Sequence, residues 1–352
     1  MRALTVVPDR VGSLRVQEVP DPVAGADELL VDGVALGICG TDREIAAGEY
    51  GWAPPGQDHL VLGHESLGRV RTAPPGSGFA PGDLVVGIVR RPDPVPCGAC
   101  ARGEFDMCRN GRYVERGIKQ IDGYGSSVWV VPVDYAVKLD PALARVGVLM
   151  EPTTVVAKAW DQIERINNRA WFAPRTVLVT GAGPIGLLAA LLGVQRGLDV
   201  HVLDRTSEGP KPTLVADLGA TFHTGSALEV AERIDVDIVI EATGAPAVAL
   251  QLMSLSNPGV LVCLTGVSSP GDDSGVDVGA LNRNLVLDNA LVFGSVNANR
   301  HHYQLAAQAL AEADPAWLER LITRRLPLER APEAFAAGDH ADIKVVIDLE
   351  AN

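Results

Sequence analysis

The sequence is poor in cysteine, in positive charge and in long apolar stretches. Each shortage argues against particular classes of protein. Its longest apolar run, residues 185–194, is too short for a membrane span of ~20 residues. The N-terminus has no apolar signal region, so we expect a cytoplasmic protein whose five cysteines are thiols or metal ligands. Lysine and arginine number 30 against 44 acidic residues, and the resulting net charge of −14 disfavours a nucleic acid or an anionic membrane as partner.

What the sequence does contain is enough chain for about two domains, since it has 352 residues. Within residues 1–140, short β-like runs are separated by glycine and proline. They are 29–31, 60–62, 84–86 and 128–131. This pattern predicts an all-β, barrel-like unit.

After about residue 150 the pattern changes to strands alternating with helices. Strands are expected at 176–180, 200–203, 236–240, 260–264 and 291–294, and helices at 184–195, 212–218, 245–255 and 302–312. Such alternation predicts a parallel sheet covered on both faces. A further strand is expected in the tail, at 344–349.

A glycine-rich turn follows the first of these strands, with the sequence Gly181-Ala182-Gly183-Pro184-Ile185-Gly186. In a strand–turn–helix context, Gly181 allows the tight turn, Gly183 admits a pyrophosphate and Gly186 permits close helix–strand packing. The helix N-terminus then offers free N–H groups to the phosphates. The alternative is a glycine turn in an unliganded α/β domain.

An acid at the end of the next strand bears on which dinucleotide would bind. The carboxylate of Asp204 can accept hydrogen bonds from the adenosine ribose diol and would repel a 2′-phosphate. The guanidinium of Arg205, in contrast, can pair with that phosphate. We therefore expect NAD in preference to NADP, with NADP remaining open.

Three residues far apart in the chain could bind a metal ion. A catalytic zinc keeps three protein ligands and one open position. Cys39, His64 and Glu151 can supply a thiolate, an imidazole and a carboxylate. Each has a structural explanation when taken alone, but their joint placement upstream of the nucleotide motif favours a catalytic zinc.

These motifs together resemble zinc-dependent medium-chain dehydrogenases/reductases. The motifs are Cys39-Gly40-Thr41-Asp42, Gly63-His64-Glu65-Ser66-Leu67-Gly68, Gly82-Asp83-Leu84-Val85, Glu151-Pro152 and Gly181 to Gly186. Four further stretches, at 89–92, 115–118, 150–156 and 294–299, look like the glucose dehydrogenase branch. The resemblance implies a GroES-like β-barrel catalytic domain (1–155, completed by 310–352) and a Rossmann doubly wound parallel sheet domain (156–309). It also implies a homodimer or homotetramer.

The resemblance implies roles for residues around the metal. The hydroxyl of Thr41 would take the substrate proton, as a relay form of general base catalysis. Asp42 would orient the His64 ring. Glu65 would be a carboxylate that approaches zinc when the bound water is displaced. Thr243, Thr265 and Asn297 would belong to the cofactor site, with Asn297 near the nicotinamide or substrate.

Substrate binding is implied for Glu115, Glu151 and His302, which would hydrogen-bond sugar hydroxyls. Such polar groups penalise an apolar alcohol that leaves them unpaired. One departure bears on the substrate, because Ala157 stands where the branch often has an acid. The change could alter which sugar, or which sugar-like ring, is accepted.

A second departure concerns the structural-zinc lobe of the family, whose pattern is C-x2-C-x2-C-x7-C. Here Cys97, Cys100 and Cys108 match the last three positions, and Pro94 occupies the first. A structural zinc normally has four protein ligands. Three thiolates leave the fourth position to an aspartate, to water or to nothing, so this is an incomplete structural zinc site or a lobe held by packing alone.

The leading hypothesis from the sequence is a zinc-dependent, NAD(P)-linked aldose 1-dehydrogenase that oxidises the C1 hydroxyl of glucose to a lactone. A close alternative keeps the chemistry and changes the substrate to an inositol, an aminocyclitol or another sugar-like secondary alcohol. A metal-free quinone or enone reductase would have no use for the Cys39–His64–Glu151 set. A nucleotide sensor without turnover would have no use for Thr41 beside an open metal site.

Overall fold

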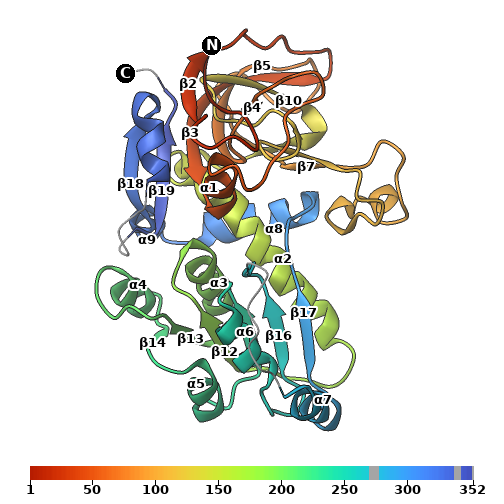
Figure 1. Cartoon of the computed structure of the whole chain (residues 1–352), viewed down its shortest axis with the longest axis vertical. Helices are drawn as coiled ribbons and strands as arrows, with labels where there is room; N and C mark the ends of the chain where they lie inside the picture. Colours follow the sequence, from red (N-terminus) through yellow and green to blue (C-terminus); the bar gives the residue numbers. More distant parts are fainter. Residues whose placement is uncertain (269–276, 337–341, 351–352) are drawn as a thin grey trace. The chain divides into compact units, whose positions relative to one another are not determined.

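The computed structural model describes residues 1–268, 277–336 and 342–350. The chain forms two compact units (Figure 1). The first unit comprises Met1–Glu151 and Ala298–Asn352, and the second comprises Pro152–Asn297. The boundaries expected from the sequence, 155/156 and 309/310, fall inside the helices α2 (Met150–Asn167) and α8 (Arg300–Glu312). Helix α8 belongs to the first unit, where the Tyr303 hydroxyl accepts a hydrogen bond from the Val89 N–H at 3.3 Å.

The first unit is mainly β-structure. Its strands are β1 (Arg2–Val6), β2 (Arg15–Glu18), β3 (Glu28–Ile38), β4 (Leu60–Val61), β5 (Glu65–Thr72), β6 (Leu84–Gly87), β7 (Arg90–Arg91), β8 (Val114–Arg116), β9 (Gln120–Ile121), β10 (Val128–Pro132), β11 (Ala136–Lys138), β18 (Ile322–Pro327) and β19 (Lys344–Asp348). Its largest sheet has the order β11-β6-β5-β3-β19-β18, with β10 also paired to β3. The C-terminal strand β19 therefore lies inside the sheet, between β3 and β18.

Short helices complete the first unit. They are α1 (Gly40–Ala46), η1 (Cys100–Arg102), η2 (Phe105–Met107), η3 (Val133–Tyr135), η4 (Pro141–Leu143), η5 (Gly147–Leu149), α8, α9 (Pro315–Leu321) and η6 (Leu328–Phe335). Helices η1 and η2 lie in a lobe that projects from the rest of the unit (Figure 1). The unit has its own core, in which Leu36, Tyr124 and Trp129 are buried with Ile347 from the tail.

The second unit contains a parallel sheet, as the sequence predicts, but with six strands where five were expected. Its strands are β12 (Thr176–Thr180), β13 (Asp199–Leu203), β14 (Thr221–His223), β15 (Ile238–Glu241), β16 (Leu261–Leu264) and β17 (Leu291–Gly294), in the order β14-β13-β12-β15-β16-β17. The accompanying helices are α2 from Pro152 onward, α3 (Pro184–Gln195), α4 (Lys211–Asp217), α5 (Ala227–Arg233), α6 (Pro246–Met253) and α7 (Val278–Leu287). The order is that of a doubly wound dinucleotide-binding sheet, whose strand order reverses beside β12.

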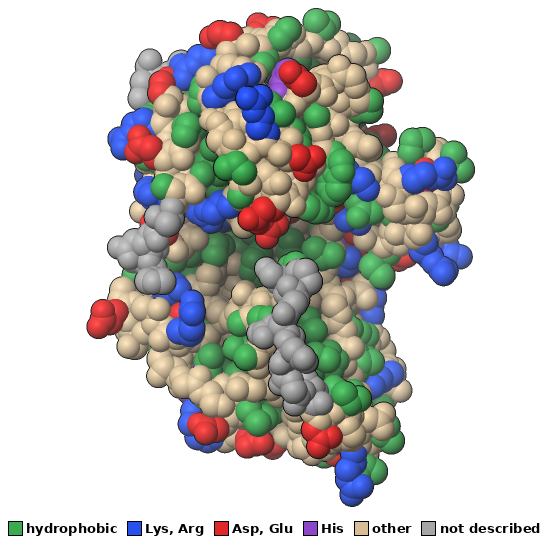
Figure 2. Space-filling model, viewed as in Figure 1, with side chains coloured by type: hydrophobic (Ala, Val, Ile, Leu, Met, Phe, Trp, Pro, Cys, Tyr) green, Lys and Arg blue, Asp and Glu red, His purple; other side chains and the backbone are tan. Residues whose placement is uncertain are grey.

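Charged side chains of both signs lie on the surface of both units (Figure 2). On the face drawn in Figure 2, acidic and basic side chains lie interspersed on both units, without a continuous basic stretch. Within the described residues, no helix combines the length and the apolar character that crossing a membrane requires.

Candidate metal and substrate site

Strand register brings the first predicted metal ligands together. Cys39 follows the last residue of β3, and His64 immediately precedes β5. Antiparallel pairing sets Gly37 opposite Glu65, so the end of β3 lies beside the start of β5. The Cys39 Sγ and His64 Nε2 atoms are 3.1 Å apart. Two residues that are 25 positions apart in sequence therefore become neighbours for a purely topological reason.

The carboxylate grouped with them is that of Glu65. Ligand atoms of Cys39, His64 and Glu65 all lie within 4.8 Å of one another. Glycine at position 37 makes room for this carboxylate, because a Cβ there would lie 2.0 Å from Glu65 Oε2. Glu151, on the first turn of α2, is not in this tight group.

The charged groups of this site still influence the pKa of Glu151. Burial raises the pKa of Glu151 to about 7, and the Glu65 carboxylate adds to the rise against the lowering effects of His64 and Lys344. A carboxyl with a raised pKa suits a site where a cation or a substrate hydroxyl approaches.

Asp42 lies directly behind the His64 ring. Its Oδ2 accepts a hydrogen bond from the Cys39 N–H at 2.9 Å, and its Oδ1 is 3.3 Å from His64 Nδ1. Among the described residues neither Oδ1 nor Nδ1 has a partner with hydrogen-bond geometry. A carboxylate at Nδ1 of a histidine is the arrangement that orients a metal-binding imidazole. Thr41, the second residue of α1, is half-buried beside Asp42.

This donor set fits a zinc ion. Burial raises the pKa of the Cys39 thiol, so a bound cation is what would favour the thiolate there. Burial opposes protonation of His64, but the adjacent Asp42 carboxylate outweighs it and holds the His64 pKa well above its ordinary value. A thiolate, an imidazole and a carboxylate within reach of one point are the ligands of an open catalytic zinc.

A buried lysine that the sequence analysis missed lies beside this group. Lys344, the first residue of β19, places its Nζ 2.7 and 2.6 Å from the two Glu65 oxygens. Pairing of Val345 with Ile38 carries Lys344 to the end of β3. A single lysine in a C-terminal strand carries no motif, so only the register of β19 could have revealed it.

Two of the three residues expected to bind a sugar, Glu115 and His302, are buried in the first unit, whereas Glu151 interacts electrostatically with the metal group. Glu115 Oε1 accepts hydrogen bonds from Arg90 Nε and Nη2, both at 3.0 Å. The Arg90 guanidinium also lies 3.7 Å from the centre of the Tyr113 ring. His302 is on the first turn of α8 and only 1% exposed. The polar partners of Glu115 and His302 were not evident from the sequence.

Among the described residues, the cysteine lobe groups three thiols without a fourth His, Cys, Asp or Glu ligand. Ligand atoms of Cys97, Cys100 and Cys108 lie within 4.8 Å of one another. Hydrogen bonds from the N–H groups of Arg109 and Cys100 lower the Cys97 pKa to about 6. The nearby Asp93 carboxylate already accepts hydrogen bonds from the Val95 N–H, Asn110 Nδ2 and Arg112 Nε. The sequence left the fourth ligand position to an aspartate, to water or to nothing. The aspartate beside the thiols, Asp93, already accepts hydrogen bonds from other groups.

The lobe yields a prediction about metal content. Because a three-thiolate site lacks the closing fourth ligand, we expect the protein to keep about one zinc per chain after dialysis against a mild chelator. Replacing Cys108 with Ser should leave that content unchanged, as measured by inductively coupled plasma mass spectrometry. A fall from two zinc ions to one in the Cys108→Ser protein would show that the lobe holds its own ion.

In the second unit, the glycine turn lies at the carboxyl end of β12. Gly181 has a φ of +92°, and Gly183 has open space where a Cβ would stand. At position 186 a Cβ would lie 1.7 Å from the Gly181 carbonyl oxygen, so only glycine lets α3 begin directly against the turn. Pro184 and Ile185 form the first turn of that helix.

Asp204 is already bonded to this turn. Its Oδ2 accepts from the Ala182 N–H at 2.7 Å and lies 3.2 Å from Lys211 Nζ, and its Oδ1 accepts from the Thr206 N–H. Burial alone would raise its pKa, but these hydrogen bonds and the lysine hold the pKa below its ordinary value. Arg205 is exposed. The cation next to Asp204 is thus Lys211, which the sequence analysis did not single out.

The remaining residues expected at the cofactor lie along the carboxyl ends of β15 to β17. The hydroxyl of Thr243 donates to Glu241 Oε1, and that of Thr265 donates to the Glu241 carbonyl at 2.7 Å. Glu241, buried at the end of β15, therefore organises this edge. Asn297 has a φ of +63°, a left-handed conformation that asparagine tolerates.

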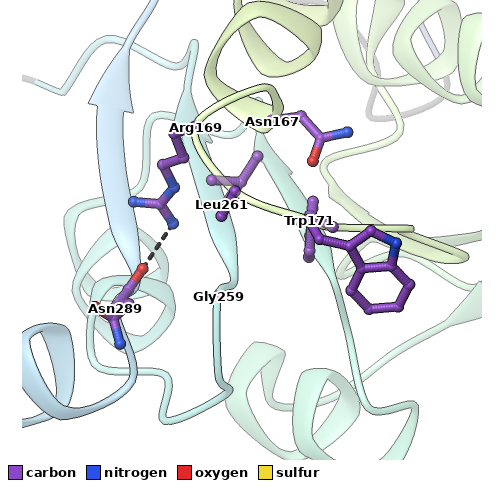
Figure 3. A pocket seen from close by; sticks show the side chains of 8 residues that line it. Asn167, Arg169, Trp171, Gly259, Leu261 and Asn289 are labelled. Atoms are coloured by element: carbon purple, nitrogen blue, oxygen red, sulfur yellow. Dashed lines mark hydrogen bonds between the residues drawn. The ribbon is translucent and has the colours of Figure 1, made fainter.

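The pocket in Figure 3 lies at the opposite ends of the strands. Its volume is about 370 Å³, and it is lined by Asn167, Arg169, Ala170, Trp171, Phe172, Gly259, Leu261 and Asn289. Leu261 begins β16 and Asn289 precedes β17, so the pocket opens at the amino ends. Nucleotides bind parallel sheets at the carboxyl ends, so this pocket is not the cofactor site.

Comparisons with known proteins agree with this architecture. A family model described as "Glucose dehydrogenase C-terminus" matches residues 144–349, and one described as "Alcohol dehydrogenase GroES-like domain" matches residues 25–141. The chain is 37% identical to a glucose 1-dehydrogenase of Methanocella arvoryzae, covering 100% of both chains. It is 40% identical to that of Thermoproteus tenax, covering 99% of this chain and 100% of the relative. A Haloferax mediterranei glucose dehydrogenase in complex with NADP, Zn and gluconolactone has 33% identity and a TM-score of 0.90, covering 100% of both chains.

Proposed function

Because the chain belongs to the zinc-dependent medium-chain dehydrogenase/reductase family, in its glucose dehydrogenase branch, we propose that it oxidises the C1 hydroxyl of glucose to the lactone. It is an NAD(P)-dependent oxidoreductase of the aldose dehydrogenase type. The main support for the proposal is that the ligand atoms of Cys39, His64 and Glu65 lie close together in the first unit. The gluconolactone in the Haloferax complex supports the choice of product.

The residues of this chain would have two roles, to bind the zinc and to transfer the substrate proton. Cys39 and His64 would hold the zinc, with Glu151 or Glu65 as the third ligand. When bound, the zinc supplies Lewis acidity to the substrate hydroxyl. Thr41 would accept the hydroxyl proton and pass it toward solvent, while Asp42 keeps the His64 ring oriented. Asn297 would help to hold the nicotinamide, which supplies a hydride acceptor when bound.

Selection of a sugar would depend on buried polar groups. Glu115 and His302 are 6% and 1% exposed, and their polar side chains match the hydroxyls of a sugar better than the surface of an apolar alcohol. Sites of this kind reject analogues that lack the hydroxyl far more strongly than apolar pockets reject extra bulk. A cyclitol would offer similar hydroxyls and remains the alternative substrate.

The test is a panel of aldoses, inositols and aminocyclitols, assayed with NAD and NADP in parallel and with the zinc content measured on the same preparation. We expect reduction of the nicotinamide with glucose and formation of gluconolactone. Faster turnover of a cyclitol would favour the alternative substrate. Turnover by a zinc-free preparation would favour a metal-free reductase, and binding without turnover would favour a sensor. Light scattering on that preparation tests the proposed dimer or tetramer.

For the cofactor, we propose that Asp204 favours NAD and that Lys211 keeps NADP usable. The carboxylate offers acceptors to the ribose diol, whereas the ammonium 3.2 Å away partly neutralises it and can pair with a 2′-phosphate. The Haloferax relative, crystallised with NADP, supports the second part.

Replacing Lys211 with Met should therefore shift the preference toward NAD. We expect kcat/KM with NADP to fall by about tenfold or more, since a charge-assisted hydrogen bond to phosphate contributes roughly 1.5–3 kcal/mol. The value with NAD should change by less than about twofold. Replacing Arg205 with Met in parallel tests the other candidate partner of the 2′-phosphate, and a larger loss there would assign that role to Arg205 instead. An equal loss with both cofactors would contradict the assignment of Lys211.

A further inference from the structure

Two thiols of the lobe that projects from the first unit lie close enough to react with each other (Figure 1). Cys97 and Cys100 are both free thiols, and their Sγ atoms are 3.7 Å apart. A disulfide needs an Sγ–Sγ distance of about 2.05 Å, so a small side-chain rotation covers the difference. The C-x2-C spacing is also that of dithiols which open and close during thiol–disulfide exchange.

The surroundings of these two sulfur atoms differ. The Cys97 side chain is half-buried, and its sulfur accepts a hydrogen bond from the main-chain N–H of Arg109 at 3.4 Å. Such a donor stabilises the thiolate, which is the nucleophilic form of a cysteine. Cys100 is only 9% exposed, and burial disfavours a thiolate. Cys97 is therefore the thiol that attacks an oxidant, and Cys100 is the thiol that resolves the product.

The third thiol of the lobe is tied to the buried part of the unit. Cys108 directly follows η2, which contains Asp106. The Asp106 side chain accepts a hydrogen bond from Asn299 Nδ2 at 2.7 Å, and its carbonyl accepts one from Arg90 Nη1 at 2.9 Å. Both Asp106 and Asn299 are 6% exposed. A shift of Cys108 would disturb these contacts, whereas a shift of Cys97 would not.

We propose that Cys97 and Cys100 form a redox pair that closes to a disulfide on contact with a low-molecular-weight disulfide and reopens on reduction by a thiol. The Cys97 thiolate attacks one sulfur of the small disulfide, whose S–S bond breaks, and the leaving thiolate takes up a proton. Cys100 then loses its proton and attacks the Cys97 sulfur, which releases the other half of the reagent as a second thiol. Two protein thiols and one small disulfide thus become one protein disulfide and two small thiols.

This chemistry is separate from the proposed catalytic centre. The Cys39 sulfur lies 3.1 Å from His64 Nε2, where a zinc ion would hold it. Cys263 is fully buried in β16. In zinc-loaded protein, the lobe therefore holds the thiols that a small disulfide can reach.

Trypsin separates the possible products of oxidation. It cleaves after Arg102 and Arg109, so Cys97 and Cys100 stay in one peptide and Cys108 falls in the next. Zinc-loaded protein is incubated with excess glutathione disulfide, the remaining thiols are alkylated, and the digest is analysed by mass spectrometry. We expect the peptide with Cys97 and Cys100 to lack two hydrogen atoms, and Cys108 to be alkylated. Dithiothreitol should restore both thiols.

Single substitutions assign the two roles. In Cys100→Ser, the reaction should stop at the mixed disulfide, so that Cys97 carries a glutathione adduct. In Cys97→Ser, modification of Cys100 should be slower than that of native Cys97 by at least about tenfold, because its thiolate is disfavoured. Cys108→Ser is the matched control and should form the Cys97–Cys100 disulfide at the native rate.

Three results would overturn the proposal. Peptides joined through Cys108 would assign the disulfide to another pair, and an unchanged digest in excess oxidant would show that the pair does not react. Protection of all three thiols that ends when zinc is removed would make the lobe a metal site instead. The readout is covalent and needs no sugar, so inactivity toward every polyol would reject the proposed function and leave this inference standing.

Discussion

Replacing Cys39 with Ser is expected to lower kcat/KM by at least about a thousandfold, because metal Lewis acidity contributes several kcal/mol to such reactions. The alcohol oxygen that replaces Sγ is a far weaker zinc ligand at neutral pH than a thiolate. Zinc content should fall from about one ion per chain toward zero. The measurements are steady-state kinetics and mass-spectrometric metal analysis of the same preparation.

Nucleotide binding provides the internal check on the Cys39→Ser protein. The glycine turn lies in the second unit, so NAD(P)H affinity measured by fluorescence titration should stay within about threefold of the native value. Cys263→Ala, which removes a thiol buried in β16, is the matched control and should keep its zinc. Full activity in Cys39→Ser would reject the zinc mechanism.

Replacing Lys344 with Met should lower the free energy of unfolding by about 3–5 kcal/mol, because removing one member of a buried ion pair leaves the other charge uncompensated. Lys344 and Glu65 are 3% and 2% exposed, and Lys344 Nζ contacts both Glu65 oxygens. Urea unfolding followed by circular dichroism measures the loss. It should be done with metal-free protein, so that zinc binding does not offset it.

The double variant Glu65→Gln/Lys344→Met separates the charge effect from lost packing. It should recover most of the stability lost in Lys344→Met, since no buried charge is then unpaired. Arg325→Met is a control, as its ion pair with Asp348 joins the neighbouring strands β18 and β19 at the surface and should contribute less than about 1 kcal/mol. Equal losses for the single and double variants would show that Lys344 acts through packing.

Elements with strong local signals were predictable from the sequence. The strand at 176–180 and the glycine turn after it lie where periodicity places them, since a buried strand ending in glycines has few alternatives. The expected helices at 212–218 and 245–255 differ from α4 and α6 by one or two residues at each end. Strand β14 is three residues long and was missed, because so short a run carries no period.

The domain boundaries and the partners of the site residues needed the structure. The sequence of α8 predicts a helix but not the unit on which it packs. Its buried residues, which include Tyr303 and His302, show that it packs in the first unit. Lys344 and Asp106 likewise stand in segments without motifs. Their roles depend on pairings between residues more than 190 positions apart, which local patterns do not encode.

The position of β19 inside the large sheet also affects how the protein is made. Its neighbours β3 and β18 are separated by nearly the whole chain, and β19 itself ends at Asp348. During synthesis, β3, which is followed by Cys39, cannot pair its backbone along this edge until β19 has been made. The second unit, made of contiguous sequence, has no such delay. Loss of β19 would therefore leave an unpaired strand edge prone to aggregation beside an unfinished metal site.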